Sequence, residues 1–352
     1  MLFTPFTLRS VTLRNRIMVS PMCQYSSEDG FATDWHLVHL GTRAVGGAAL
    51  VVTEATAVEP RGRISPRDLG IWKDEHVPML HRIAEFVQRQ GAVPGMQIAH
   101  AGRKASVEVP WRGGAPVPAG QGGWTPVGPS AIPYADGSPV PQVLSEHDIA
   151  QLVEAFASAA RRARAAGFKV VELHFAHGYL VHEFLSPLSN TRTDGYGGSF
   201  ENRSRFAREI ARAVRAAWPA DLPLAARISA SDWAPGGWDI DDSVRLSAAL
   251  KQDGVDLVDC SSGGNIHTAK FSAGPGYLTP YAERIRREAG VPTAAVGFIT
   301  SPQQADQVLR AGQADLVVLA RQLLREPYWP LRAAAELHAE GAWPDQYLRA
   351  RP

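Results

Sequence analysis

Eight short apolar segments alternate along this chain with longer amphipathic segments rich in alanine and arginine. Such alternation is typical of parallel strands joined by crossover helices, and eight repeats favour a closed barrel over an open sheet. We therefore expect an α/β fold, the (β/α)8 TIM barrel. The expected strands are Ile17–Met22, Ala49–Glu54, Gly95–Ala99, Val170–His174, Leu224–Ser229, Val255–Cys260, Thr293–Gly297 and Asp315–Ala320. The expected helices include His36–Val45, Val77–Gln90, Glu146–Ala166, Arg203–Trp218, Asp242–Asp253, Tyr281–Ala289, Pro302–Ala311 and Pro330–Ala339.

The alternative fold is an open, doubly wound sheet. Its glycine fingerprint normally lies between the first strand and the first helix, whereas Pro21-Met-Cys-Gln-Tyr-Ser26 follows the first expected strand here. The 352 residues show no evident linker, so we expect one domain over 1–352. After the third strand comes a long excursion, 103–143, in which 15 of 41 residues are glycine or proline. Because it carries Trp111 and Trp124, we expect a partly packed lid over the catalytic face.

Charge and hydropathy narrow the classes of partner. Lysine and arginine number 36 against 35 acidic residues, a formal net charge of +1, so nothing favours binding to nucleic acid or a membrane surface. No stretch approaches the ~20 apolar residues of a membrane span, and the start shows no pattern of a cleavable leader. Cys23 and Cys260 offer no disulfide framework. We expect a cytoplasmic protein that acts on small molecules.

The fourth expected strand and the loop after it carry the strongest chemical signal. Side chains alternate on a strand, so Glu172 and His174 share one face, opposite an aliphatic face. His177 and Tyr179 follow where the strand ends. Two imidazoles and a phenol at one strand end can supply two hydrogen-bond donors and a proton to a substrate oxygen. In a barrel this is the end where active residues gather.

Other strand ends predict a bound cofactor. Gln97 and Arg227 face inward by the same alternation; a carboxamide can donate and accept together, as a pyrimidine-like ring edge requires, and a guanidinium can stabilise negative charge on such a ring. Loops after strands seven and eight often bind phosphate, and here they carry Gly297 and Arg321. Together these features predict flavin mononucleotide across the barrel mouth, where Cys23 could adjust its redox behaviour.

Two other interpretations remain open at this point. His174 and His177 have the spacing of some metal ligands, which would suit a metal-dependent barrel hydrolase, although no clear third ligand accompanies them. A non-catalytic flavin-binding scaffold is the other possibility. Taken alone, Cys23 fits a small buried side chain better than a functional thiol.

Several longer motifs resemble one known family nearly end to end. The chain is similar to the old yellow enzymes, which are flavin-dependent ene reductases, and specifically to their thermophilic-like bacterial branch of YqjM and xenobiotic-reductase type. The motifs that carry the resemblance are Leu13-Arg-Asn-Arg-Ile17, Ser20-Pro-Met-Cys23, Gln97-Ile-Ala-His-Ala-Gly-Arg-Lys104, His174-Phe-Ala-His-Gly-Tyr179, Leu185-Ser-Pro-Leu-Ser-Asn190 and Arg192-Thr-Asp-Gly-Tyr-Gly-Gly-Ser-Phe-Glu-Asn-Arg203.

The resemblance implies a role for each matching residue. His174 and His177 would hold the substrate carbonyl, Tyr179 would donate the proton, Cys23 would tune the flavin, and Tyr25 would contact the substrate. Arg349 resembles the C-terminal arginine that this branch often extends into a neighbouring subunit's site, although the tail around it differs. The implied flavin contacts are Ser20, Pro21, Met22, Cys23, Ala55, Gln97, Arg227, Gly297, Ala320 and Arg321, with Ala320 standing where the family has glycine.

The function implied by the resemblance is reduction of the C=C bond of α,β-unsaturated carbonyl compounds. FMN would be the bound cofactor and NADPH, or else NADH, the reductant, in a ping-pong cycle with hydride transfer through flavin N5. No metal is implied. The partners would be small activated alkenes and further copies of the chain, in a homodimer or homotetramer.

Overall fold

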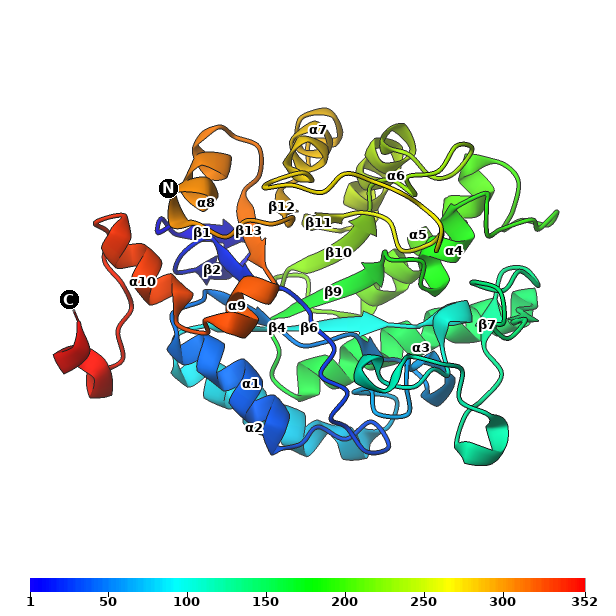
Figure 1. Ribbon diagram of the computed structural model, residues 1–352, viewed down its shortest axis with the longest axis horizontal. Helices are drawn as coiled ribbons and strands as arrows, with labels where there is room; N and C mark the ends of the chain where they lie inside the picture. The colour runs from blue at the N-terminus through cyan, green and yellow to red at the C-terminus, as the bar shows by residue number, and fades with distance from the viewer. Residues whose placement is uncertain (352) are drawn as a thin grey trace.

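Eight parallel strands close into a barrel in the computed structural model, which describes residues 1–351 (Figure 1). Each strand pairs with the next, and the eighth returns to the first through the register Val317↔Ile17, Val318↔Met18 and Leu319↔Val19. The (β/α)8 barrel is therefore confirmed and the open sheet is excluded. The barrel strands are β3 (Ile17–Val19), β4 (Leu50–Val52), β6 (Val93–Ala99), β9 (Val170–Phe175), β10 (Leu224–Ser229), β11 (Leu257–Ser261), β12 (Thr293–Ala295) and β13 (Leu316–Leu319).

An outer layer of helices covers the barrel (Figure 1). Their ends follow local signals: the Ser145 side chain accepts from the Asp148 N–H at the start of α3, and Ser301 caps α8, which begins with Pro302. The long helices are α1 (Asp34–Val45), α2 (Val77–Arg89), α3 (Glu146–Ala165), α5 (Phe200–Ala217), α6 (Ile240–Gln252), α7 (Thr279–Ala289), α8 (Pro302–Arg310) and α10 (Trp329–Glu336).

Several elements differ from the expected bounds. The first strand stops at Val19 rather than Met22, because the chain turns into a loop at Ser20-Pro21 and proline has no N–H to donate. β12 likewise ends at Ala295, two residues before Gly297. Two short helices, α4 (Leu180–Leu185) and α9 (Arg321–Arg325), and the hairpin β1 (Phe6–Leu8) and β2 (Val11–Leu13), were not expected at all. Elements this short leave no clear periodicity in a sequence.

Alternation along the strands separates two cores. On β9, Val171, Leu173 and Phe175 point outward into the core between barrel and helices. Val170 points inward and joins an apolar cluster at the end of the barrel where the strands begin, which we call the lower end. The β1–β2 hairpin closes that end, because its Leu8 and Leu13 pack into the same cluster.

The excursion 103–143 lies beside the upper, C-terminal end of the strands (Figure 1). Trp124 packs against a small buried cluster that Cys23, Tyr25 and Tyr179 also contact, and its ring N–H donates to the Arg61 carbonyl at 2.9 Å. Trp111 remains 65% exposed, edge-on to Tyr25 with ring centroids 5.7 Å apart. The excursion is therefore partly packed, and its role as a lid stays a prediction. Its short elements are η3 (Gly102–Lys104), η4 (Pro110–Arg112), η5 (Ala119–Gln121), β7 (Val127–Gly128) and β8 (Gln142–Val143).

Within residues 1–351, no helix combines the length and the apolar character that crossing a membrane requires.

Candidate active site at the barrel mouth

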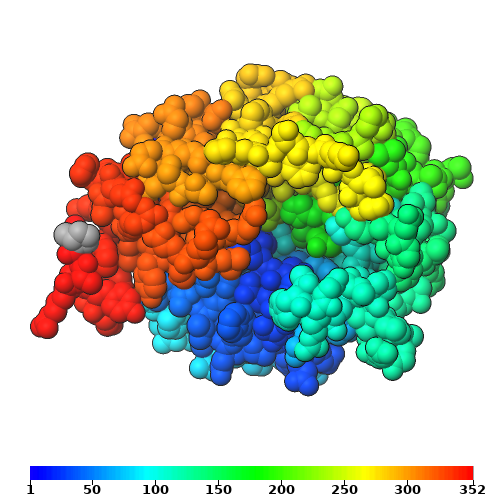
Figure 2. Space-filling view, viewed as in Figure 1, coloured from blue at the N-terminus to red at the C-terminus, as the bar shows by residue number. Residues whose placement is uncertain are grey.

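Two cavities open at the upper end of the barrel and meet at Arg227, which lines both. Figure 2 shows the mouth as a hollow bordered by cyan, yellow and orange segments. The inner cavity is lined by Pro21, Cys23, Tyr25, Ala55, Gln97, His174, His177, Tyr179 and Arg227. The outer cavity has among its lining residues Arg227, Tyr277, Gly297, Phe298, Ala320, Arg321 and Arg325.

The two histidines face each other across the inner cavity. His174 Nε2 lies 3.3 Å from His177 Nδ1, and the rings are edge-on with centroids 5.0 Å apart. The Ala176 N–H donates to His174 Nδ1 at 3.2 Å, so His174 carries its proton on Nε2, which points at its partner. His177 Nε2 lies 2.7 Å from the Ser261 hydroxyl. The Tyr179 ring stands edge-on to His174, also at 5.0 Å.

Burial holds all three side chains in their neutral forms. It lowers the pKa of both His174 and His177 well below the ordinary histidine value, and the nearby Arg227 guanidinium lowers them further. Burial also raises the pKa of Tyr179 well above that of a free phenol. Neutral imidazoles donate hydrogen bonds without carrying charge, and a protonated phenol keeps a proton to give.

The turn that carries His177 is held by hydrogen bonds to both the N–H and the carbonyl of that residue. His177 adopts φ +62°, a conformation that is uncommon outside glycine. Its N–H donates to Ser229 Oγ at 2.9 Å, and its carbonyl accepts from Lys104 Nζ at 2.8 Å. The same lysine donates to the Gly264 carbonyl at 2.9 Å. Surrounding contacts therefore impose this conformation, as strained residues require.

Below the histidines lies a layer of buried polar side chains inside the barrel. Gln97 Nε2 donates to Glu172 Oε1 at 2.7 Å, Arg227 lies 3.3 Å from Asp259 Oδ2, and Arg227 also donates to the Ser20 hydroxyl at 3.0 Å. Burial, together with the Asp259 charge, raises the pKa of Glu172 to about 8. This layer fixes the amide and the guanidinium that face the inner cavity.

Cys23 and Tyr25 occupy the wall beside the excursion. Burial raises the pKa of the Cys23 thiol well above its ordinary value, with further contributions from the Asp68 and Glu54 carboxyls. Tyr25 has a positive φ of +49°, and burial raises its pKa as well. Both side chains are therefore neutral at physiological pH, so Cys23 is present as a thiol and not as a thiolate.

The outer cavity has the features of an anion site. Gly297 has φ +123°, and a Cβ there would lie 3.1 Å from the Tyr277 ring, so the close backbone approach requires glycine. The Arg321 guanidinium sits over the Phe298 ring at 4.7 Å from its centroid. Arg325, one turn further along α9, lines the same cavity. Two permanent cations beside exposed backbone suit a phosphate.

Three predicted site residues do not line either cavity. Ser20 is buried and acts on Arg227 through its hydroxyl, and the Met22 side chain packs against the outer core. Arg349 lies in η6 (Asp345–Ala350), in the tail that projects away from the barrel (Figure 1). It is exposed and far in the fold from the mouth of its own barrel, so any contact with an active site requires another subunit.

Some functional candidates were missed. Asp259, Ser229 and Ser261 face inward by alternation on β10 and β11, and the same pattern that singled out Arg227 could have identified them. No sequence pattern identified Lys104 and Arg325, because the direction of a side chain in a loop or a very short helix cannot be predicted from strand alternation.

The two cavities fit a flavin mononucleotide. The inner cavity offers a neutral amide and a guanidinium to a planar ring. Glu172 Oε2 has no hydrogen-bond partner within the described residues, and Arg227 Nε has only the ion-pair contact with Asp259 at 3.3 Å. The outer cavity offers cations and a glycine cradle to a phosphate. Among residues 1–351, no group of three or more potential metal ligands comes together, so the hydrolase interpretation lacks a ligand set in that part of the chain.

Comparison with known proteins agrees with the geometry. The model of the NADH:flavin oxidoreductase / NADH oxidase family matches residues 1–340. An NADPH dehydrogenase of Geobacillus sp. (strain WCH70) is 51% identical over 351 residues, which cover 99% of this chain and 98% of the relative. An NADPH dehydrogenase of Bacillus cytotoxicus is 49% identical, with 99% and 96% covered.

Solved structures show the same fold. Morphinone reductase in complex with tetrahydroNAD superposes with a TM-score of 0.79 at 27% identity, covering 98% of this chain and 92% of that one. A 2-naphthoyl-CoA reductase complex gives a TM-score of 0.86 at 25% identity, covering 96% of this chain but 52% of the longer reductase. The chain therefore belongs to the NADH:flavin oxidoreductase / NADH oxidase family, the family of the old yellow enzymes, and is an oxidoreductase.

Proposed function

We propose that this chain is an FMN-dependent ene reductase that uses NADPH to reduce the C=C bond of α,β-unsaturated carbonyl compounds. The observation that carries the proposal is the convergence of His174, His177 and Tyr179 on one cavity that continues, past Arg227, into an anion site. The names of the Geobacillus and Bacillus relatives support NADPH as the reductant.

FMN would lie with its ring in the inner cavity and its phosphate in the outer one. Gln97 and Arg227 would face the pyrimidine edge, with Ser20 holding Arg227 in place. Bound FMN supplies the hydride transfer that no side chain can perform. The other residues proposed to contact it are Pro21, Met22, Cys23, Ala55, Gly297, Ala320 and Arg321.

The histidine pair would bind the substrate carbonyl oxygen. His174 is fixed as the Nε2–H form by the Ala176 N–H. When the Ser261 hydroxyl donates to His177 Nε2, His177 carries its proton on Nδ1. The two N–H groups then face each other across the 3.3 Å between the ring nitrogens, so this state needs an acceptor, and a carbonyl oxygen beside both nitrogens could accept from both. Preorganised donors of this kind stabilise the enolate-like charge that develops as the alkene is reduced.

Tyr179 would supply the proton. It is neutral because burial raises its pKa, and it shares the inner cavity with both histidines. From there it can protonate the α-carbon while the carbonyl stays on the histidines. General acid catalysis by a positioned side chain typically contributes about 10²–10⁴-fold.

The remaining predicted features belong to the same proposal. Residues 1–352 would form one FMN-binding domain, with 103–143 as a lid whose Trp111 contacts Tyr25 beside the substrate. Cys23 would lie against the flavin as a neutral thiol and adjust its potential. Arg349 would reach a neighbouring subunit's site in a homodimer or homotetramer.

An anaerobic visible spectrum tests the proposal directly. Purified protein is recorded alone, then after NADPH, then after 2-cyclohexenone. The proposal expects a yellow protein that NADPH bleaches and the enone recolours. A yellow protein that NADPH cannot reduce would indicate a flavin-binding scaffold, and a colourless protein that FMN cannot reconstitute would exclude the flavin site.

A further inference from the structure

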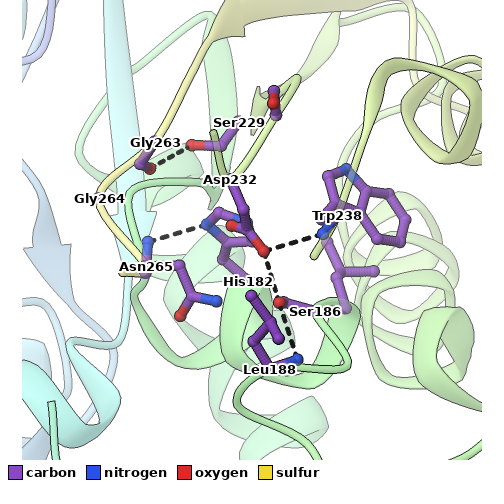
Figure 3. Close-up of polar contacts among 12 residues, drawn as sticks. His182, Ser186, Leu188, Ser229, Asp232, Trp238, Gly263, Gly264 and Asn265 are labelled. Atoms are coloured by element: carbon purple, nitrogen blue, oxygen red, sulfur yellow. Dashed lines mark hydrogen bonds and ion pairs between the residues drawn. The ribbon is translucent and has the colours of Figure 1, made fainter. Parts of the chain in front are cut away.

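Figure 3 shows a cluster of buried polar side chains around Asp232. The cluster is linked to the turn that carries His177 and Tyr179 by a hydrogen bond from the Gly178 N–H. It joins His182, within α4, and Ser186, the residue that follows α4, to Asp232 in the loop after β10. None of the three side chains is exposed to solvent. His182 Nε2 lies 3.0 Å from Asp232 Oδ1, and Asp232 Oδ2 accepts from the Ser186 hydroxyl at 2.5 Å and from the Trp238 N–H at 2.9 Å.

The cluster contains serine, histidine and aspartate, but it cannot act as a nucleophilic triad. In such a triad the histidine bridges the other two residues and takes the serine proton. Here the Ser186 hydroxyl donates to the carboxylate instead, on the side away from His182. With no exposed surface, the group also has no access to a substrate. Its role must therefore lie in the backbone segment to which His182 is hydrogen-bonded.

His182 holds the turn between the two catalytic candidates. The Gly178 N–H donates to His182 Nδ1 at 2.9 Å, and Gly178 stands between His177 and Tyr179 in the sequence. Gly178 has φ +69°, and a Cβ there would lie 2.3 Å from the Gly264 carbonyl oxygen. The turn is thus pressed against the 264–265 backbone on one side and anchored by His182 on the other.

This anchor works in only one tautomer of the imidazole. To accept from the Gly178 N–H, Nδ1 must carry a lone pair, so the proton of a neutral ring must sit on Nε2. Nε2 then lies 3.0 Å from Asp232 Oδ1, an ion-pair contact rather than an aligned hydrogen bond, and neither atom has a hydrogen-bond partner among residues 1–351. A carboxylate at this distance attracts a proton on Nε2 and therefore favours the tautomer that the turn needs.

We propose that Asp232 and His182 are positioning residues that fix His177 and Tyr179 by holding His182 in its Nε2–H tautomer, so that the Gly178 N–H always finds an acceptor. The kinetic consequence rests on the proposed ene reduction, whereas the tautomer itself does not. Neither residue touches substrate or cofactor. Their effect reaches the reaction through the turn alone.

The charge state of Asp232 supports this role. Burial acts to raise its pKa, but His182 and the hydrogen bonds from Ser186 and the Trp238 N–H outweigh burial, and the pKa lies below the ordinary aspartate value. The carboxylate is thus ionised across the working pH range. It is a permanent acceptor facing Nε2.

The decisive variant is Asp232→Asn, which keeps the size of the side chain. Its amide oxygen would take the place of Oδ2, where Ser186 and Trp238 donate, and its NH₂ would face His182 Nε2. His182 must then accept at Nε2 and carry its proton on Nδ1, so two N–H donors face each other at Gly178. We expect the rate constant for 2-cyclohexenone with the NADPH-reduced enzyme, measured by anaerobic stopped flow, to fall about 10- to 100-fold. The dissociation constant for FMN should not change.

Ser186→Ala is the matched control. It removes a hydrogen bond to the same buried carboxylate but leaves the charge of Asp232 and the tautomer of His182 as they are. Its melting temperature should fall, while its rate constant for 2-cyclohexenone stays at the wild-type value. If Ser186→Ala slows that reaction as much as Asp232→Asn does, the cluster is only structural and the proposal is wrong.

A second test uses the double variant. In His182→Asn the side-chain oxygen can accept from the Gly178 N–H and has no tautomer to select. Asp232→Asn should therefore cause no further loss of rate in that background, because its effect passes through the imidazole. An equal loss in both backgrounds would show that Asp232 acts by another route.

Nitrogen-15 NMR of histidine-labelled protein measures the tautomer without any turnover. The sequence has 11 histidines, and comparison with His182→Asn identifies the signal of His182. We expect the Nε2–H pattern in the wild-type protein and the Nδ1–H pattern in Asp232→Asn. An Nδ1–H pattern in the wild type would overturn the proposal, even if the variants do not fold. A protein that binds no FMN but shows the Nε2–H pattern would contradict only the proposed function.

Discussion

The lower and upper halves of the barrel interior are built by the same strands but have opposite chemistry. In the lower half, inward positions are apolar and pack against the hairpin, as Val170 and Leu257 do. Two residues further along the same strands, roughly 6–7 Å higher, the inward positions are Glu172 and Asp259. Alternation puts each pair on the same face, so position along the strand decides whether the interior is a core or a site.

The lower half of the interior mainly stabilises the fold, whereas the upper half forms the candidate active site. The lower cluster is buried and closed by the β1–β2 hairpin, and its apolar side chains stabilise the fold by burial. The upper layer keeps a guanidinium and carboxyl groups away from solvent with some of their atoms unpartnered, as at Glu172 Oε2. Buried polar atoms without partners are costly, and a bound cofactor would supply the missing partners. The predictions below test this separation, from the largest expected effect to the smallest.

Tyr179→Phe in the upper half should change chemistry and leave stability alone. We expect the reaction of the reduced enzyme with 2-cyclohexenone to slow by about 10²–10⁴-fold, the usual contribution of a general acid. Reduction of bound flavin by NADPH and the melting temperature should be unaffected, because neither uses the phenolic proton. Stopped-flow absorbance separates the two half-reactions. Equal losses in both would contradict the role given to Tyr179.

Leu13→Ala in the lower half should do the reverse. Leu13 is buried in the cluster that closes the barrel, so its truncation should lower the free energy of unfolding by about 2–5 kcal/mol. The rate with 2-cyclohexenone, measured well below the melting temperature, should match the wild type. Leu348→Ala is the control, since that leucine is 50% exposed and its loss should barely change urea unfolding. A slower enzyme would show that the two halves are coupled.

Arg321→Met tests whether the outer cavity binds the phosphate of FMN. A hydrogen bond from a charged group contributes about 1.5–3 kcal/mol, so FMN should bind roughly 10- to 100-fold more weakly. The variant should also show a smaller loss of FMN affinity in high salt, because one cation has been removed. Quenching of FMN fluorescence at two salt concentrations measures both. Arg287→Met, at an exposed position on α7, should leave binding unchanged, and an equal effect there would argue against a local anion site.

Glu172→Gln tests whether the upper layer carries a buried proton. Burial and Asp259 raise the pKa of Glu172 to about 8, so between the ordinary glutamate pKa and that value the folded protein binds a proton that the unfolded chain has lost. Stability must then fall as pH rises through this window. Glutamine keeps the oxygen that accepts from Gln97, so the free energy of unfolding should depend less on pH in the variant. Urea titrations at pH 6 and pH 9 measure the slopes, and identical slopes would mean that Glu172 is ionised throughout.

Much of the barrel could be predicted from the sequence because its signals are local and repeated. β10 was predicted at its observed bounds, Leu224–Ser229, and α2 to within one residue. The inner cavity was also largely predictable, since strand alternation and the position of a strand end place Gln97, His174 and Arg227. The lining of the outer cavity was less predictable. Gly297 and Arg321 were identified, but Arg325 and Tyr277 lie on segments where no periodicity predicts the direction of the side chains.

The sequence by itself determined the fold class, the inward face of each strand and the catalytic candidates, because these follow from periodicity and residue chemistry. Only the tertiary structure decided which neutral groups share a cavity, that Ser20 acts through Arg227, and that Asp232, 50 positions from His182 in sequence numbering, sets the state of a turn it never touches. Such relations depend on distances between segments that are remote along the chain. No local pattern records them, because each partner satisfies ordinary helix, strand or loop preferences on its own.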